Sequence, residues 1–161
     1  MIGGSNSVNY QTKYQSSPSP DESTALVKYI TRGSKALATL TSAGLDADER
    51  DIEGFRLFAT SQSMARLHTI SFSQEFATDD LVERAHSVAR NHLDGEWLLT
   101  VHDGISGHKH LHIAQAGSKR DCTMDTEDIK AFRTALGNQF PNETIGADSE
   151  TDDSDAEGGF A

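Results

Sequence analysis

The histidines of this chain are concentrated in one short segment, and imidazoles grouped in this way can bind a metal ion. Four of the seven histidines fall between residues 102 and 112: His102, His108, His110 and His112. Imidazole is a common ligand of divalent metals and titrates near neutral pH. In an extended strand alternate residues share a face, so His108, His110 and His112 would point the same way, with next-but-one neighbours about 7 Å apart. The segment therefore predicts a strand that carries a row of imidazoles.

His102 is expected to join this row from a neighbouring strand. It ends the apolar segment EWLLTVH (96–102), and a short Gly-containing loop separates it from the segment 109–115. Two strands joined in this way form a hairpin. Imidazoles from His102, His110 and His112 would leave coordination positions open for water or a substrate oxygen, as a catalytic metal requires. His108 is an alternative ligand, and a surface histidine cluster without function is the alternative to a metal site.

A metal ion facing a phosphate would neutralise the charge that grows on its oxygens, but the reaction also needs a nucleophile. Two of the three tyrosines lie in the polar N-terminal segment, and only Tyr29 lies in a predicted helix. Tyrosine can form covalent intermediates, although with a pKa near 10 it needs help to lose its proton. Lys28, Arg32 and Lys35 would supply phosphate contacts around it. A half-buried helix tyrosine, packed three residues after Leu26, is the alternative.

The charge of the chain is unevenly distributed. The net charge is −11, but residues 144–161 hold six acids and no base, so residues 1–143 carry only −5. Contacts with DNA must therefore rest on local patches rather than on the overall field. The acidic segment 144–161 is expected to be a disordered tail that could contact accessory proteins, and residues 1–20, rich in Ser, Gly and Pro, a disordered polar arm.

The remaining composition predicts a small cytoplasmic protein with one folded domain. A single cysteine, Cys122, excludes a disulfide framework and fits a reducing compartment. No apolar run is long enough to span a bilayer, and the polar N-terminus is no signal peptide, so no membrane partner is expected. The folded domain should cover about residues 21–143.

The hydrophobic pattern of this domain predicts helices and strands in the order α-α-β-α-β-β-α. Helices are expected over about 23–32, within 46–65, over 78–93 and over 125–136, from apolar residues at helical spacing and their flanking caps. Strands are expected over 67–73, which alternates strictly between apolar and polar residues, over 96–102 and over 109–115. The expected fold class is α+β, with an antiparallel sheet packed on helices.

With these segments in order, the chain resembles the relaxases, the plasmid mobilisation nucleases of the HUH endonuclease superfamily, and in particular the type related to the Ti-plasmid border endonuclease. Three segments over about residues 24–116 carry the likeness: Tyr29–Lys35, His68–Glu75, and Val101–Asp103 with His108–Ile113. Rolling-circle initiators of the same superfamily place the tyrosine after the histidine pair. No tyrosine follows Tyr29 here, so only the relaxase order is available.

The resemblance implies an activity and a set of roles. Tyr29 would attack a phosphodiester of single-stranded DNA at a nick site, giving a 5′-phosphotyrosyl link and a free 3′-hydroxyl. A divalent ion, Mg²⁺ or Mn²⁺, would be held by His102, His110 and His112. Asp103, with His108 as an alternative, would orient a ligand or help to accept the tyrosine proton. Phosphate contacts would come from the cations Arg32, Lys35 and Lys109. The setting would be plasmid mobilisation, or replication of a mobile element or virus, in a prokaryotic cytoplasm.

The chain departs from the family pattern in three respects. Asp103 follows His102 directly, whereas the family often has a residue between them. Gln115 stands where an asparagine is common, and the chain is short for a complete relaxase. Two other functions are therefore kept as alternatives: a non-catalytic DNA-binding or interaction protein with the same fold, and a metal-dependent phosphoesterase that uses water as its nucleophile.

Overall fold

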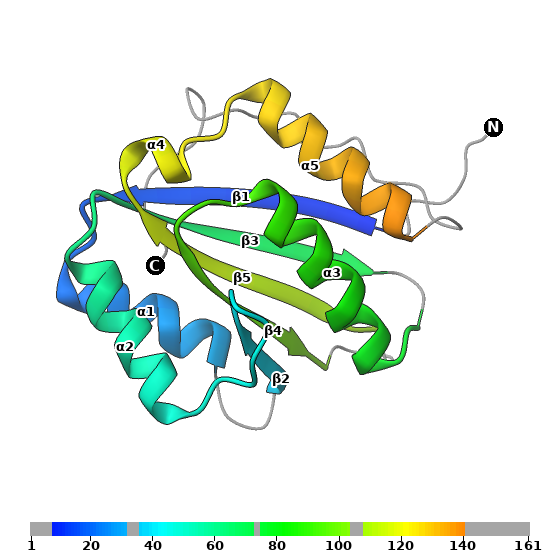
Figure 1. Ribbon diagram of the computed structural model, residues 1–161, viewed down its shortest axis with the longest axis horizontal. Helices are drawn as coiled ribbons and strands as arrows, with labels where there is room; N and C mark the ends of the chain where they lie inside the picture. The colour runs from blue at the N-terminus through cyan, green and yellow to red at the C-terminus, as the bar shows by residue number, and fades with distance from the viewer. Residues whose placement is uncertain (1–7, 32–35, 73–74, 104–107, 141–161) are drawn as a thin grey trace.

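One antiparallel sheet with helices on both faces forms the computed structural model of this protein, which describes residues 8–31, 36–72, 75–103 and 108–140 (Figure 1). This is the α+β class that the sequence predicts. The sheet has the strand order β1-β3-β5-β4-β2. The strands are β1 (Val8–Ser16), β2 (Ala36–Thr41), β3 (Met64–Phe72), β4 (Glu96–His102) and β5 (His110–Gly117). The helices are α1 (Pro20–Thr31), α2 (Glu49–Thr60), α3 (Thr78–His92), α4 (Lys119–Cys122) and α5 (Thr126–Gln139).

Each of the seven predicted elements has a counterpart in the structure. The strongest agreement is β4, whose bounds match the predicted strand 96–102, and its expected hairpin partner is β5. Two of the helices begin directly after aspartates that the sequence prediction did not use. Asp48 and Asp125 cap α2 and α5 through side-chain bonds to the backbone N–H groups of Asp51 and Asp128, and each bond is returned in a capping box.

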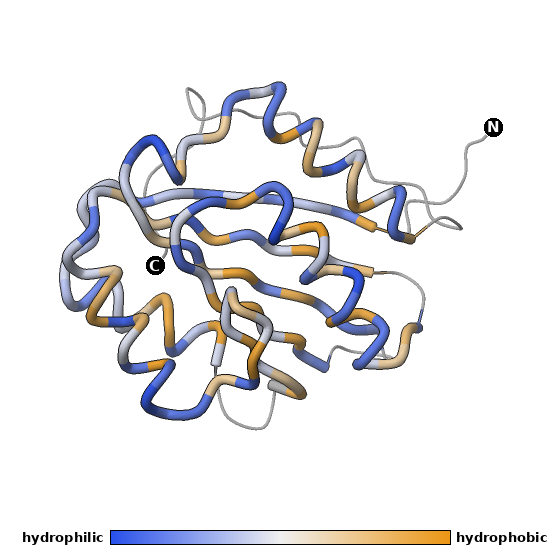
Figure 2. The backbone as a smooth tube through the Cα atoms, in the orientation of Figure 1, coloured by the Kyte–Doolittle hydropathy of each residue, from blue (hydrophilic) through white to orange (hydrophobic). Residues whose placement is uncertain are grey.

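The prediction of a disordered arm over residues 1–20 is wrong for residues 8–16, which form β1. This strand pairs with β3 along its whole length, from Val8 opposite Phe72 to Ser16 opposite Met64. Its apolar side chains Val8 and Tyr10 are fully buried, whereas Gln11 and Lys13 are exposed. Figure 2 shows a strand that is neutral or hydrophilic along most of its length. An edge strand needs few apolar residues, because only one of its faces is covered.

Two further elements were not predicted. The strand β2 forms the other edge of the sheet, where it pairs with β4. The short helix α4 follows β5 and is capped by Ser118. Pro20 also begins α1, a residue that suits the first position of a helix because its missing N–H is not needed there. The predicted acidic tail 144–161 lies outside the described residues.

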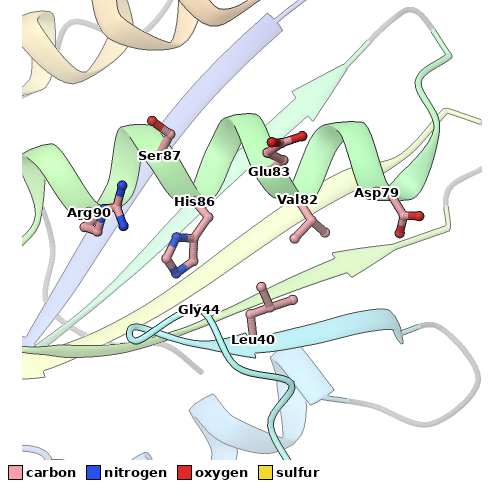
Figure 3. A pocket seen from close by; sticks show the side chains of 8 residues that line it. All are labelled: Leu40, Gly44, Asp79, Val82, Glu83, His86, Ser87 and Arg90. Atoms are coloured by element: carbon pink, nitrogen blue, oxygen red, sulfur yellow. The ribbon is translucent and has the colours of Figure 1, made fainter.

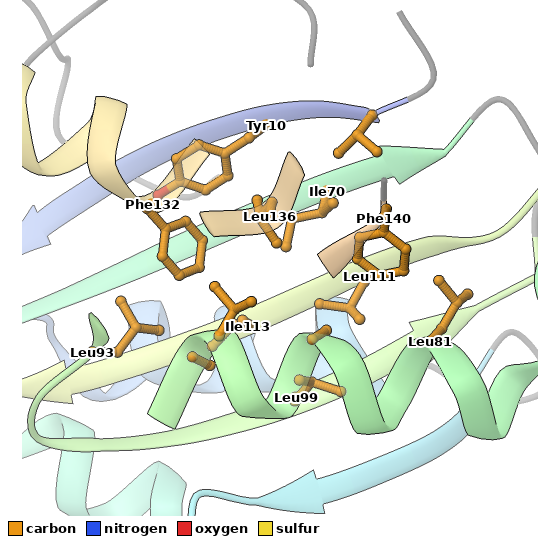
Figure 4. Packing of buried hydrophobic residues seen from close by; sticks show 14 of the residues in the cluster. Tyr10, Ile70, Leu81, Leu93, Leu99, Leu111, Ile113, Phe132, Leu136 and Phe140 are labelled. Atoms are coloured by element: carbon orange, nitrogen blue, oxygen red, sulfur yellow. The ribbon is translucent and has the colours of Figure 1, made fainter. Parts of the chain in front are cut away.

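The sheet has a hydrophobic core on each face. On one face α3 and α5 pack against alternate residues of the strands (Figure 4), among them Ile70, Leu99, Leu111 and Ile113. On the other face α1 and α2 pack on a smaller core that includes Leu26, Phe55, Leu67 and Leu98. Leu98 and Leu99 are neighbours on β4 and serve opposite cores, as the two-residue period of a strand requires.

The helices α1 and α2 cover only part of their face. Their strand contacts are mainly with β5, β4 and β2, while β1 lies at the far edge of the sheet. The polar residues of β1 that point to this side therefore stay accessible. Within the described ranges, no helix combines the length and the apolar composition that a membrane crossing requires.

Candidate functional site

Three of the predicted ligands share the face of the sheet under α1. His102 on β4 lies directly opposite His110 on β5, as the hairpin predicts. His112 is two residues further along β5 and therefore points to the same side as His110. The residue between them, Leu111, is fully buried in the core under α3 and α5. The predicted alternation is confirmed for His110 and His112, whereas His108 precedes the strand.

The imidazoles differ in their burial and spacing. The rings of His102 and His112 are 4.6 Å apart between centroids and both are almost fully buried. The ring of His110 is half-buried and lies 6.3 Å from that of His112. His102 and His112 therefore form a close pair, with His110 at its more accessible side.

Tyr29 is brought to this pair by α1. Its ring meets that of His112 edge-on, with centroids 5.1 Å apart and planes at 69°. The tyrosine is 40% exposed, although Leu26, Val27 and Ile30 around it on the helix are buried. The helix thus uses its apolar stripe to dock on the sheet and presents the aromatic side chain at the border between the buried histidines and solvent.

A hydrogen bond ties His102 to the helix that carries Tyr29. The Nε2 of His102 lies 2.6 Å from the backbone oxygen of Ile30. A carbonyl can only accept, so Nε2 carries the hydrogen, and in the neutral ring the lone pair belongs to Nδ1. The Ile30 carbonyl is among the last of α1, which have no partner within the helix, so this bond also satisfies the helix end.

Two threonines flank His112 across the sheet. Thr69 on β3 and Thr100 on β4 both lie opposite it in register. The Oγ1 of Thr69 is 3.4 Å from the Nδ1 of His112. The hydroxyl of Thr100 is fully buried and has no hydrogen-bond partner among the described residues. Sequence reasoning missed both. The pairing of β3 with β5 that places Thr69 is not visible in the sequence, whereas the predicted hairpin of β4 and β5 could have placed Thr100.

The donor set fits a transition metal better than magnesium. Imidazole nitrogens suit ions such as Zn²⁺, whereas Mg²⁺ prefers oxygen ligands. The carbonyl bond of His102 is the kind of outer contact that orients metal-binding histidines. Within the described segments, however, no three His, Cys, Asp or Glu side chains are grouped closely enough to hold an ion as they stand. The ring of His110 lies 6.3 Å from that of His112, whereas the rings of His102 and His112 are 4.6 Å apart.

The other predicted site residues lie in different surroundings. Asp103 is exposed directly after β4, and His108 is half-buried just before β5. Lys109 is not brought together with the histidines, because its Nζ donates to the backbone oxygen of Phe76, 2.8 Å away in the segment before α3. Arg32 and Lys35 lie outside the described residues.

A pocket of about 310 Å³ lies beside Tyr29. The strands β1 and β3 supply its floor and α1 supplies the tyrosine. Its lining consists of Gln11, Thr12, Lys13, Tyr29, Leu67 and Thr69. Because Thr69 also contacts His112, the pocket and the histidine pair are adjacent. None of the β1 residues was predicted as a site residue, although the alternation of apolar and polar side chains over residues 8–13 was a usable signal.

A third buried histidine lies on the opposite face of the sheet. His68 on β3 is fully buried, with Tyr10 Oη 2.8 Å from its Nδ1 and Gln115 Oε1 2.8 Å from its Nε2. Gln115 donates through its Nε2 to the carbonyls of Asp94 and Asp121, so its oxygen faces His68 as an acceptor. Burial, with the nearby charge of Arg66, lowers the pKa of His68 to about 3. This group is a structural polar network and not part of the site.

Comparison with known proteins does not assign the chain to a family. No protein-family model matches the sequence, and no curated protein shows a significant match to it. The functional interpretation therefore rests on the residues and their arrangement.

Proposed function

We propose that this protein nicks and rejoins single-stranded DNA, with Tyr29 as the nucleophile. The observation that carries the proposal is the contact between Tyr29 and His112, from segments far apart in the chain. The tyrosine is 40% exposed, so it is accessible from solvent beside the buried imidazole of His112. In this proposal the domain has the arrangement of the relaxases, with the tyrosine helix before the histidine strands.

The reaction exchanges one phosphodiester for another. The Oη of Tyr29 attacks the scissile phosphorus and forms a phosphotyrosyl bond, while the bond from phosphorus to the 3′-oxygen breaks. The phenolic proton leaves to a base, and the departing 3′-oxygen takes up a proton to give a free hydroxyl. Because no net hydrolysis occurs, the 3′-hydroxyl can attack the phosphotyrosyl bond and restore the strand.

Each candidate residue has a role in this scheme. His102, His110 and His112 would hold a divalent ion, Mg²⁺ or Mn²⁺, which would withdraw charge from the scissile phosphate. Asp103, or His108 in its place, would accept the phenolic proton. Arg32 and Lys35, which follow Tyr29 closely in the chain, would contact the DNA backbone. The biological setting would be mobilisation or replication of a plasmid, mobile element or virus, with the acidic tail available to accessory proteins.

A covalent adduct is the direct test. The protein is incubated with a pool of single-stranded DNA of random sequence and with Mn²⁺ or Mg²⁺, and then run on a denaturing gel. We expect a protein–DNA adduct that Tyr29→Phe abolishes. Tyr14→Phe is the matched control, because Tyr14 lies on β1 and does not line the pocket beside Tyr29.

The outcomes separate the three functions. Cleavage that survives in Tyr29→Phe without an adduct would indicate a phosphoesterase that uses water. Binding of single-stranded DNA without cleavage under any metal would leave the non-catalytic DNA-binding function. An adduct that persists in Tyr29→Phe would show that another residue is the nucleophile.

A further inference from the structure

The pocket beside Tyr29 differs in charge from other pockets of this acidic protein. One lies between α3 and β2 and is lined by Asp79 and Glu83 besides Arg90 (Figure 3). Another, beside α4, is lined by Asp94, Asp121 and Asp128. The pocket at Tyr29 has no carboxylate in its lining, and it has one cation, Lys13. In a chain with a net charge of −11, this is a surface suited to an anionic ligand.

The strand β1 arranges the polar groups of this pocket. Gln11 lies opposite Thr69 and Lys13 opposite Leu67, so both side chains point to the same side of the sheet as the histidines. Both are exposed, while Tyr10 and Val8 on the same strand are buried under α5. The amide of Gln11 can donate and accept at once, which is the pattern needed to read the edge of a nucleobase. Leu67 and the ring of Tyr29 supply apolar surface on which the flat face of the base can pack.

We infer that this pocket receives the nucleotide next to the scissile phosphate, with Gln11 contacting the edge of its base and Lys13 a backbone phosphate. The inference rests on the proposed function, since it takes single-stranded DNA as the ligand. It adds that the chain selects its nick site in part by a base contact from its first strand, beside the nucleophile.

The test measures binding to oligo(dA), oligo(dC) and oligo(dT) by fluorescence anisotropy. Wild-type protein is expected to prefer one base over the poorest by about fivefold or more, the range of a single good base-edge contact. Gln11→Ala should bring the three affinities close together. Gln15→Ala is the matched control, because Gln15 is on the same strand but outside the pocket and donates to Ser16. It should keep the wild-type preference.

Lys13→Met should weaken binding to all three strands alike. The slope of log affinity against log salt should become shallower by about 0.7, the value for one phosphate of a single strand. Lys119→Met, in α4, is the control for the loss of one positive charge and should leave that slope unchanged.

The outcomes distinguish this inference from the proposed function. Wild-type binding without base preference, or a preference that survives Gln11→Ala, overturns the base contact even where the covalent adduct at Tyr29 forms. A salt slope that Lys13→Met leaves unchanged overturns the phosphate contact. Absence of both binding and adduct overturns the inference together with the proposed function.

Discussion

The buried histidines on the two faces of the sheet show how one residue type serves different purposes. His112 faces an exposed tyrosine and a second imidazole. His68, on the next strand, faces Tyr10 and Gln115 in a network whose carbonyl and amide partners specify which ring nitrogen carries the hydrogen. The first environment places buried imidazoles beside a partly exposed tyrosine, the nucleophile of the proposed reaction. The second holds one neutral imidazole inside the core.

His68 should make the protein sensitive to acid. Its folded pKa of about 3 lies below the unfolded value of 6.5, so the unfolded chain binds more protons between these two pH values. The free energy of unfolding should therefore fall as the pH is lowered through this window, by up to about 1.4 kcal/mol per pH unit. Urea unfolding at a series of pH values measures this slope. His68→Gln should lower this slope by the contribution of about one proton, which is up to about 1.4 kcal/mol per pH unit. A slope equal to that of the wild type would show that His68 does not cause the acid sensitivity.

Thr69 should affect adduct formation indirectly, by holding the imidazole of His112 in place. If its hydroxyl holds the imidazole in place, Thr69→Val should lower adduct formation or Mn²⁺ affinity about tenfold, the usual effect of removing an outer contact of a metal-binding histidine. Thr69→Ser keeps the hydroxyl and should retain most of the activity. Adduct rates and calorimetric Mn²⁺ titrations provide the two readouts. Equal loss in both variants would point to packing of the threonine methyl group instead.

At the scale of elements, two glycines differ in what the backbone asks of them. Gly95, before β4, has a φ of +77°, and a Cβ there would lie 2.5 Å from the backbone oxygen of Ala116. Gly54, inside α2, has nothing within 4 Å of such a Cβ. We expect Gly95→Ala to lower the free energy of unfolding by about 2 kcal/mol or more and Gly54→Ala to raise it by up to about 1 kcal/mol. Chemical denaturation tests both, and similar effects at the two positions would contradict the geometry.

The elements also mark the limit of what the sequence could predict. The helices and central strands have many apolar residues at helical or strand spacing, so they were predictable. The hairpin of β4 and β5 follows from a short loop, and with it the row of histidines was predictable. The edge strand β1 has few apolar residues and resembles a loop, and the edge strand β2 is only six residues long. Because β1 was not predicted, Gln11 and Lys13 were not predicted as site residues. The contact of Thr69 with His112 depends on pairing between distant strands, which local pattern does not specify.

At the scale of the whole molecule, the two hydrophobic cores should separate stability from function. Leu98→Ala and Leu99→Ala each remove a fully packed side chain from β4, and each should cost about 2–5 kcal/mol. Of the two, only Leu98 packs in the core that holds α1, the helix that carries Tyr29, against the sheet. Adduct formation, measured under conditions where both variants remain folded, should fall in Leu98→Ala and persist in Leu99→Ala. Equal rates of adduct formation in the two variants would show that the packing of α1 on the sheet does not determine the reactivity of Tyr29.

The strand order has a consequence for how this molecule assembles. The hairpin of β4 and β5 joins segments close in sequence, whereas β1 and β2 pair with strands much further along the chain and end up at opposite edges of the sheet. Local pairings lose less chain entropy on closure and tend to form early. We therefore expect the histidines to be assembled in the folding transition state, with φ-values in the hairpin above those in α1 and β1. Tyr29, the proposed nucleophile, would reach the histidines in the last steps of folding, so a chain stalled before them would have the histidine pair without the tyrosine beside it.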